Sequence, residues 1–154
     1  MHADCCPCTT CALHHQASTS AQAQAAGGTQ FTFSMELSQT QFRGNNVNIA
    51  DFDEAVRQAL ATVAAGANIV YREDSPAGKA RFTHIFVETT SDPVSGADSS
   101  WGRPGGTIGY GGYRDGQRFA WQDDAETWSP FVGNGTNYWL VATHEIGHAL
   151  DLDH

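Results

Sequence analysis

Two histidines and one glutamate near the end of the chain have the types and the spacing of a metal-dependent hydrolytic site. His144 and His148 are four residues apart, so on a helix they lie on one face, with Cβ atoms about 5–6 Å apart, and can bind one metal ion together. Glu145 follows His144 directly, which turns its carboxylate away from easy ligation but leaves it within reach of a water molecule at the metal. The pattern predicts a zinc site with a general base beside it.

A third histidine completes this set. A catalytic zinc ion usually takes three protein ligands and leaves one position for water or substrate. His154 follows His148 by six residues, and we interpret it as the third ligand. For the short H-E-x-x-H stretch alone, the alternative is a surface helix with histidines placed by chance. The third histidine and the apolar residues around the motif favour the metal site.

The site needs a helix that buries its opposite side. We predict this helix from about Asn137 to Leu150, because its apolar residues fall on the side away from His144 and His148. These residues are Trp139, Ala142, Ile146, Ala149 and Leu150. The polar side of the helix is then free to line a cleft.

An amphipathic helix is also predicted earlier in the chain, from Asp51 onward. Asp51 and Glu54 are expected to form a capping box at its start, and Gly66 is expected to end it. Apolar residues recur there at intervals of three and four and form one stripe. They are Phe52, Ala55, Val56, Ala59, Leu60 and Val63.

Strands are predicted on both sides of that helix. Phe31, Phe33 and Met35 alternate with polar residues, which is typical of a half-buried strand near the start of the domain. Further strands are expected at residues 67–71, 82–87, 107–110 and 119–121. Apart from the strand at 107–110, residues 89–117 are expected to form an ordered loop. This order of elements predicts an α/β (α+β) fold, a twisted mixed sheet of about five strands with two helices. His84, alone in its strand, is expected to be structural.

The first part of the chain has a different composition. Residues 1–29 are expected to be a flexible leader, followed by one domain from residue 30 to residue 154. All four cysteines, Cys5, Cys6, Cys8 and Cys11, lie within the first eleven residues and cannot cross-link the body of the fold. Three interpretations stay open: a disulfide-prone or tag-like tail, a small metal site of Cys5, Cys8 and Cys11 with or without His14, and a thiolate that inhibits the catalytic zinc.

Charge and hydropathy exclude two classes of partner. Lys and Arg total 8 against 17 Asp and Glu, giving a formal net charge of −9, which argues against a nucleic-acid or anionic-membrane surface. No apolar run approaches the roughly 20 residues that cross a bilayer. We therefore expect neither a nucleic-acid partner nor a membrane span.

The zinc motif resembles that of the metzincin endopeptidases, and among them most closely the matrixins, which are related to the matrix metalloproteinases. Two further segments carry the likeness. R-P-G-G-T-I-G-Y at residues 103–110 resembles the matrixin loop and edge strand above the active-site cleft, and D-D-A-E-T-W at residues 123–128 resembles the acidic segment that follows. The resemblance covers roughly residues 30–154.

The resemblance implies a secreted, extracellular zinc endopeptidase that acts on proteins or peptides. Glu145 would be its general base, and His144, His148 and His154 its zinc ligands. Asp123 and Glu126 match the family's acidic calcium ligands, although the same residues also fit a solvated acidic turn. The edge strand would pair with an extended substrate. Its residues are Thr107, Ile108, Gly109, Tyr110 and Gly111.

Three departures from the family pattern stand against this implication. Asp151 occupies the place of a glycine that ends the zinc helix, and the loop aspartate expected before P-G-G is missing. The C-terminal subdomain, with its methionine-bearing turn, is also missing, so residues 30–154 are expected to be the N-terminal part of the catalytic domain. The departures favour the alternative, an inactive or truncated metzincin that serves as a zinc-binding or assembly module.

Overall fold

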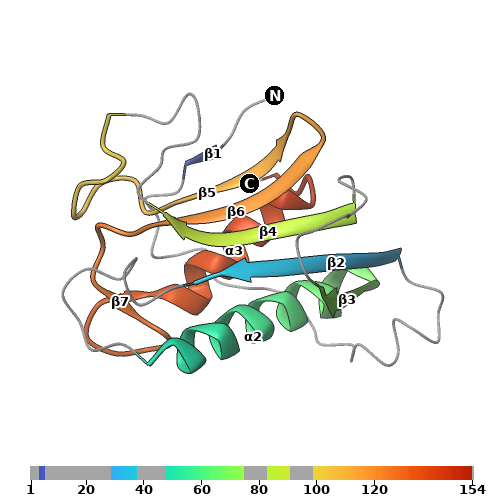
Figure 1. Cartoon of the computed structure of the whole chain (residues 1–154), viewed down its shortest axis with the longest axis horizontal. Helices are drawn as coiled ribbons and strands as arrows, with labels where there is room; N and C mark the ends of the chain where they lie inside the picture. The colour runs from blue at the N-terminus through green and yellow to red at the C-terminus, as the bar shows by residue number, and fades with distance from the viewer. Residues whose placement is uncertain (1–3, 6–28, 38–47, 75–82, 91–98, 154) are drawn as a thin grey trace.

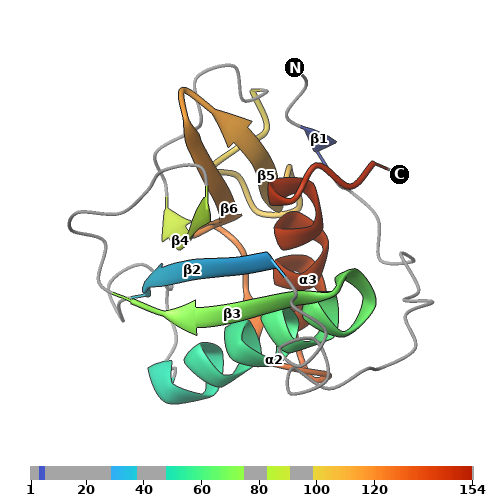
Figure 2. The same cartoon turned by 90° about the vertical axis from the view of Figure 1, so that its right-hand side faces the viewer.

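The computed structural model describes residues 4–5, 29–37, 48–74, 83–90 and 99–153. These residues form a twisted sheet with both helices on one face, where the helices also contact each other (Figures 1 and 2). The sheet contains β1 (Asp4–Cys5), β2 (Thr29–Glu36), β3 (Ile69–Glu73), β4 (His84–Thr90), β5 (Gly109–Arg114) and β6 (Gln117–Asp123). The predicted fold class is confirmed.

The sheet is mixed, with the spatial order β1-β5-β6-β4-β2-β3. The β2–β3, β2–β4 and β4–β6 pairs are parallel, whereas β5 is antiparallel to both β6 and β1. A separate parallel pair joins β7 (Trp128–Ser129) to β8 (Thr136–Asn137) just before the last helix. Without the two-residue strand β1, β5 would be an edge of the sheet.

The first helix, α2 (Ile49–Ala67), contains the predicted apolar stripe, and all its predicted members are buried. Its ends differ from the prediction. Asn48 caps the helix, with its side-chain oxygen accepting from the amide of Ala50 at 3.3 Å, so the predicted capping by Asp51 is wrong. The helix also runs past Gly66 to Asn68, which adopts a left-handed conformation with φ of 50°. Asparagine suits both caps, because it accepts at the start and tolerates positive φ at the end.

The strand after the glycine-rich loop was predicted two residues too early. β5 begins at Gly109 rather than Thr107 and continues to Arg114, where a tight hairpin turn leads into β6. Asp115 and Gly116 form this turn, with φ of 51° and 82°. An Asp-Gly pair with positive φ at both residues is typical of a type I′ hairpin, so this dipeptide carried a signal for the hairpin in the sequence.

The second helix, α3 (Tyr138–Ala149), matches the predicted zinc helix within one residue at each end. Asn137 caps it, accepting from the amide of Leu140 at 3.1 Å. Ala142, Ile146 and Ala149 are fully buried in the core, so the predicted apolar back of the helix is confirmed. This face holds α3 against α2 and the sheet.

Tyr138 anchors the start of α3. Its ring packs edge-on against Phe52 of α2 and Trp128, with centroid distances of 5.1 Å to each. Its hydroxyl lies 2.8 Å from Thr89 Oγ1 and donates to Gln122 Oε1 at 2.8 Å. Burial raises the pKa of Tyr138, so the group stays neutral. The helix is thereby tied to two strands of the sheet at its first residue.

His84 is fully buried between two strands. Its Nδ1 lies 2.7 Å from Thr32 Oγ1 and its Nε2 lies 2.9 Å from Ser34 Oγ. Both ring nitrogens thus have hydroxyl partners on β2, which is what a structural histidine requires.

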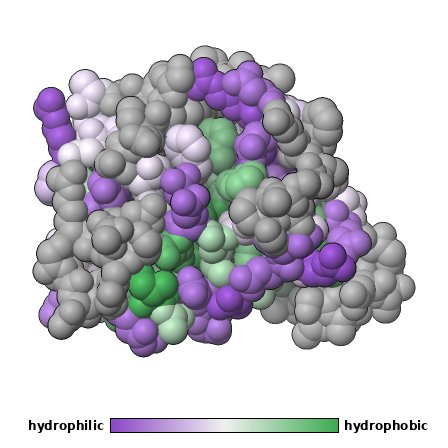
Figure 3. Space-filling view, in the orientation of Figure 1, coloured by the Kyte–Doolittle hydropathy of each residue, from purple (hydrophilic) through white to green (hydrophobic). Residues whose placement is uncertain are grey.

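The visible surface mixes hydrophilic residues with smaller hydrophobic areas, and hydrophilic residues follow the lower edge of the molecule, where α2 lies (Figure 3). Among the described residues, no helix is long and apolar enough to cross a membrane.

Candidate metal centre

The two histidines of α3 converge on one point. Their Nε2 atoms lie 2.9 Å apart, with ring planes at 88° and ring centroids at 4.5 Å. Two nitrogens bound to one tetrahedral zinc ion at about 2.0–2.1 Å would be roughly 3.3 Å apart, so a small outward shift is enough to bind the ion. This donor pair fits zinc.

The second ring nitrogen of His148 has a partner that selects its tautomer. Nδ1 lies 2.9 Å from the carbonyl oxygen of Leu152. Because a carbonyl only accepts, Nδ1 carries the proton and Nε2 keeps its lone pair for a metal. Metal-binding histidines commonly have such an outer hydrogen bond, which also fixes the orientation of the ring.

Glu145, the residue after His144, is fully buried where α3 packs against β5. Two glycines of β5 make this close passage possible. A Cβ atom at Gly109 would lie 2.6 Å from Oε1 of Glu145, and one at Gly111 would overlap the Glu145 backbone carbonyl. The strand and the helix are therefore in contact at the carboxylate itself.

Part of the predicted substrate strand is already paired with another strand, β1. Tyr110 and Gly111 pair with Cys5 and Asp4 of β1 in antiparallel register, and the four residues from Gly109 to Gly112 are buried. Thr107 and Ile108 precede β5, and the Ile108 carbonyl accepts from the amide of Asp123 at 3.0 Å. Residues 4–5 thus contribute a short strand to the edge that was predicted to bind substrate.

A pocket of about 500 Å³ opens beside the same helix. Leu140 lies four residues before His144 and therefore on the same face of α3. Most of the other lining comes from the loop before α3 and from the end of the glycine-rich loop. The lining residues are Pro104, Ile108, Glu126, Thr127, Gly135, Thr136, Asn137, Leu140 and Val141.

The acidic residues Asp123 and Glu126 hold the glycine-rich loop. Asp123 accepts from the amides of Gly102 at 2.5 Å and Ala125 at 2.8 Å. Glu126 Oε1 accepts from the amide of Gly105 at 2.6 Å. Backbone donors thus occupy oxygens of both predicted calcium ligands, and calcium binding by this pair stays a prediction.

The third predicted zinc ligand, His154, lies outside the described residues. Within the described part of the chain, no group of three or more His, Cys, Asp or Glu residues is arranged to hold a metal ion. The two histidines of α3 are the part of the predicted set that the structure brings together.

Asp151, the residue in the family's glycine position, adopts φ of 63°. Its side chain lies 2.9 Å from Nη1 of Arg118, a residue that no sequence pattern singles out. The turn after the helix therefore keeps the left-handed geometry that the departure had put in doubt.

A family model described as Matrixin matches residues 27–154. The comparison with curated proteins gives no match.

Proposed function

Because the chain belongs to the matrixin family of peptidases, we propose that it is a zinc-dependent metalloendopeptidase that hydrolyses internal peptide bonds of protein substrates. The observation that carries this proposal is the meeting of two imidazole Nε2 atoms, 2.9 Å apart, on a helix that also carries the buried Glu145. The family relationship also supports a secreted, extracellular location.

In this proposal His144, His148 and His154 hold the zinc ion. When bound, zinc supplies Lewis-acid chemistry that polarises the scissile carbonyl and acidifies the attacking water. Glu145 accepts the proton of that water and passes it to the leaving amine. Burial of Glu145 between α3 and β5 favours this role, because a general base must be held within hydrogen-bond reach of the water it deprotonates.

The substrate is proposed to bind as an extended strand along residues 107–111, pairing with the outer side of β5. Such pairing reads the backbone of the substrate more than its side chains. The pocket beside α3 would then accept one substrate side chain, and Leu140, Val141 and Ile108 in its lining favour an apolar one.

Disrupting β1 is expected to make this edge easier to occupy. Replacing both Asp4 and Cys5 with proline removes the backbone donors of β1, and KM for a peptide substrate should fall about fivefold, which corresponds to roughly 1 kcal/mol of hydrogen bonding. We expect kcat to stay unchanged, since Glu145 and the histidines of α3 are left intact. Steady-state kinetics on both proteins measures the change.

The matched control places the two prolines at Thr9 and Thr10, in the leader but outside β1. This control should keep the KM of the unmodified chain. An unchanged KM in the Asp4/Cys5 variant would show that β1 and the substrate do not share the edge.

Calcium remains a secondary proposal, with Asp123 and Glu126 as its ligands. It is supported by the match of these positions to the family's acidic segment, and calcium titration followed by calorimetry tests it.

The proposed function is tested directly by metal content and proteolysis. We expect one zinc ion per chain in the domain, cleavage of a casein-like substrate, loss of cleavage after zinc chelation, and recovery when zinc is added back. Cleavage that persists after the zinc has been removed would contradict the proposal.

A further inference from the structure

The turn after α3 contains a non-glycine residue, Asp151, in a left-handed conformation that is unfavourable for residues with a Cβ atom. The amide of Asp151 donates to the carbonyl of His148 at 3.0 Å, and the amide of Leu152 donates to the carbonyl of Gly147 at 3.1 Å. This pair of bonds is the Schellman cap, in which the left-handed position is usually glycine. Asp151 holds that position with φ of 63°, at a steric cost that glycine avoids.

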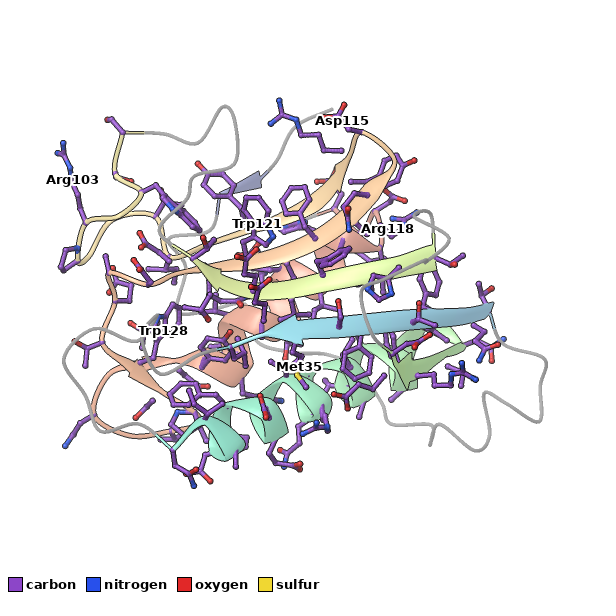
Figure 4. All side chains as sticks on the ribbon, viewed as in Figure 1. Met35, Arg103, Asp115, Arg118, Trp121 and Trp128 are labelled. Atoms are coloured by element: carbon purple, nitrogen blue, oxygen red, sulfur yellow. The ribbon has the colours of Figure 1, made fainter. Side chains whose placement is uncertain are left out.

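Arg118, the second residue of β6, contacts this turn from the sheet. Its Nη1 donates to the carbonyl of Ala149 at 2.5 Å and to Asp151 Oδ2 at 2.9 Å. Figure 4 shows Arg118 at the same end of the sheet as Asp115, which marks the tip of the β5–β6 hairpin. One guanidinium nitrogen thus joins the last turn of the helix to the residue with positive φ.

The position of Arg118 is itself fixed. Its side chain is 16% exposed, and its guanidinium lies 5.1 Å from the ring centroid of Tyr113 and 5.8 Å from that of Phe31. A cation partly removed from water and held over aromatic rings interacts more strongly than a freely exposed one. The ion pair with Asp151 is therefore better ordered than a typical surface pair.

The turn reaches the metal centre through Leu152. The residue after Asp151 places its carbonyl oxygen 2.9 Å from His148 Nδ1, and this bond orients the imidazole whose Nε2 faces His144. If Asp151 left the left-handed conformation, the Leu152 carbonyl would move and His148 would lose its outer hydrogen bond.

We propose that Arg118 is a positioning residue for the zinc site, acting through Asp151 and the carbonyl of Leu152 on His148. This inference rests on the proposed zinc binding and assigns a role to two residues outside the ligand set. Arg118 stabilises a turn that this chain builds without glycine. Placing glycine at position 151 should therefore make Arg118 dispensable.

The test measures zinc affinity by competition with a chelator of known affinity, so it does not depend on proteolysis. Arg118→Met keeps the aliphatic stem and removes the charge, and zinc should bind roughly 10–100-fold more weakly, as is usual when an outer-shell partner of a metal ligand is lost. Arg118→Met combined with Asp151→Gly should recover the affinity to within about threefold of the unmodified chain, because glycine adopts positive φ without help.

The matched control is Arg114→Met, which removes an arginine of the same hairpin that pairs with Asp115 instead and should leave zinc affinity unchanged. A second comparison changes only Asp151 in the turn and leaves every residue of the sheet in place. Asp151 is 68% exposed, so Asp151→Ala and Asp151→Gly should both fold. Alanine is expected to weaken zinc binding about tenfold through its unfavourable φ, whereas glycine should not.

Two results would overturn the inference. One is equal zinc affinity in Arg118→Met and the unmodified chain. The other is a double variant as weak as Arg118→Met alone, since Arg118 would then act through the stability of the sheet and not through Asp151. An unmodified chain that binds no zinc would overturn the proposed function, and this inference with it.

Discussion

Glu145→Gln is expected to reduce peptide-bond cleavage by roughly 10²–10⁴-fold, the usual contribution of a general base, while zinc stays bound. Glutamine keeps the size of the side chain, which matters because Gly109 and Gly111 of β5 leave little space around it. It cannot accept a proton from the attacking water. Single-turnover cleavage of a fluorogenic peptide together with zinc content per chain measures both effects.

The control is Glu54→Gln, an exposed glutamate on α2, which should leave cleavage and zinc content unchanged. Full activity in Glu145→Gln would show that another group takes the proton. If the unmodified chain binds zinc but cleaves nothing, the alternative of a zinc-binding module replaces the enzyme.

His148→Ala is expected to lower zinc affinity by more than the roughly 10–100-fold that outer-shell changes cause, because a direct ligand is lost. Cleavage should disappear when it is measured at a zinc concentration that saturates the unmodified chain but not the variant. His148 is nearly buried in α3, so thermal unfolding must be measured alongside zinc affinity to separate metal loss from loss of the fold.

A matched histidine variant separates the two candidate metal sites. His14→Ala removes a histidine of the cysteine-containing leader and should leave zinc affinity unchanged. The opposite pattern, with zinc kept in His148→Ala and lost in His14→Ala, would assign the metal to the leader cysteines and contradict the proposed centre on α3.

The zinc helix was predictable because the residues that define it lie close together in the sequence. The four-residue spacing of His144 and His148 fixes their common face, and the apolar residues around them fix which side is buried. Asn137 and Asn48 cap their helices through side chains close in sequence, so both helix starts were predictable in principle, although the capping-box pattern favours Asp51 over Asn48. The Asp115-Gly116 turn was a readable signal of the hairpin.

The remaining features depend on contacts between distant parts of the chain. Arg118 reaches Asp151 across 33 residues, and no periodicity in β6 indicates which arginine does so. The pairing of β1 with β5 likewise joins a cysteine-rich segment of no regular pattern to a strand more than 100 residues later. In both cases tertiary packing decides the partner.

The passage of β5 over Glu145 sets a mechanical limit on this molecule. A Cβ atom at Gly109 would meet the side chain of Glu145, and one at Gly111 would meet its main chain, so a larger residue at either position would push the strand away from the helix. Adaptation to bulkier substrates would have to come from the pocket beside α3, where Leu140 and Thr136 belong to the lining. Attempts to redesign specificity should vary those side chains and leave the glycines intact.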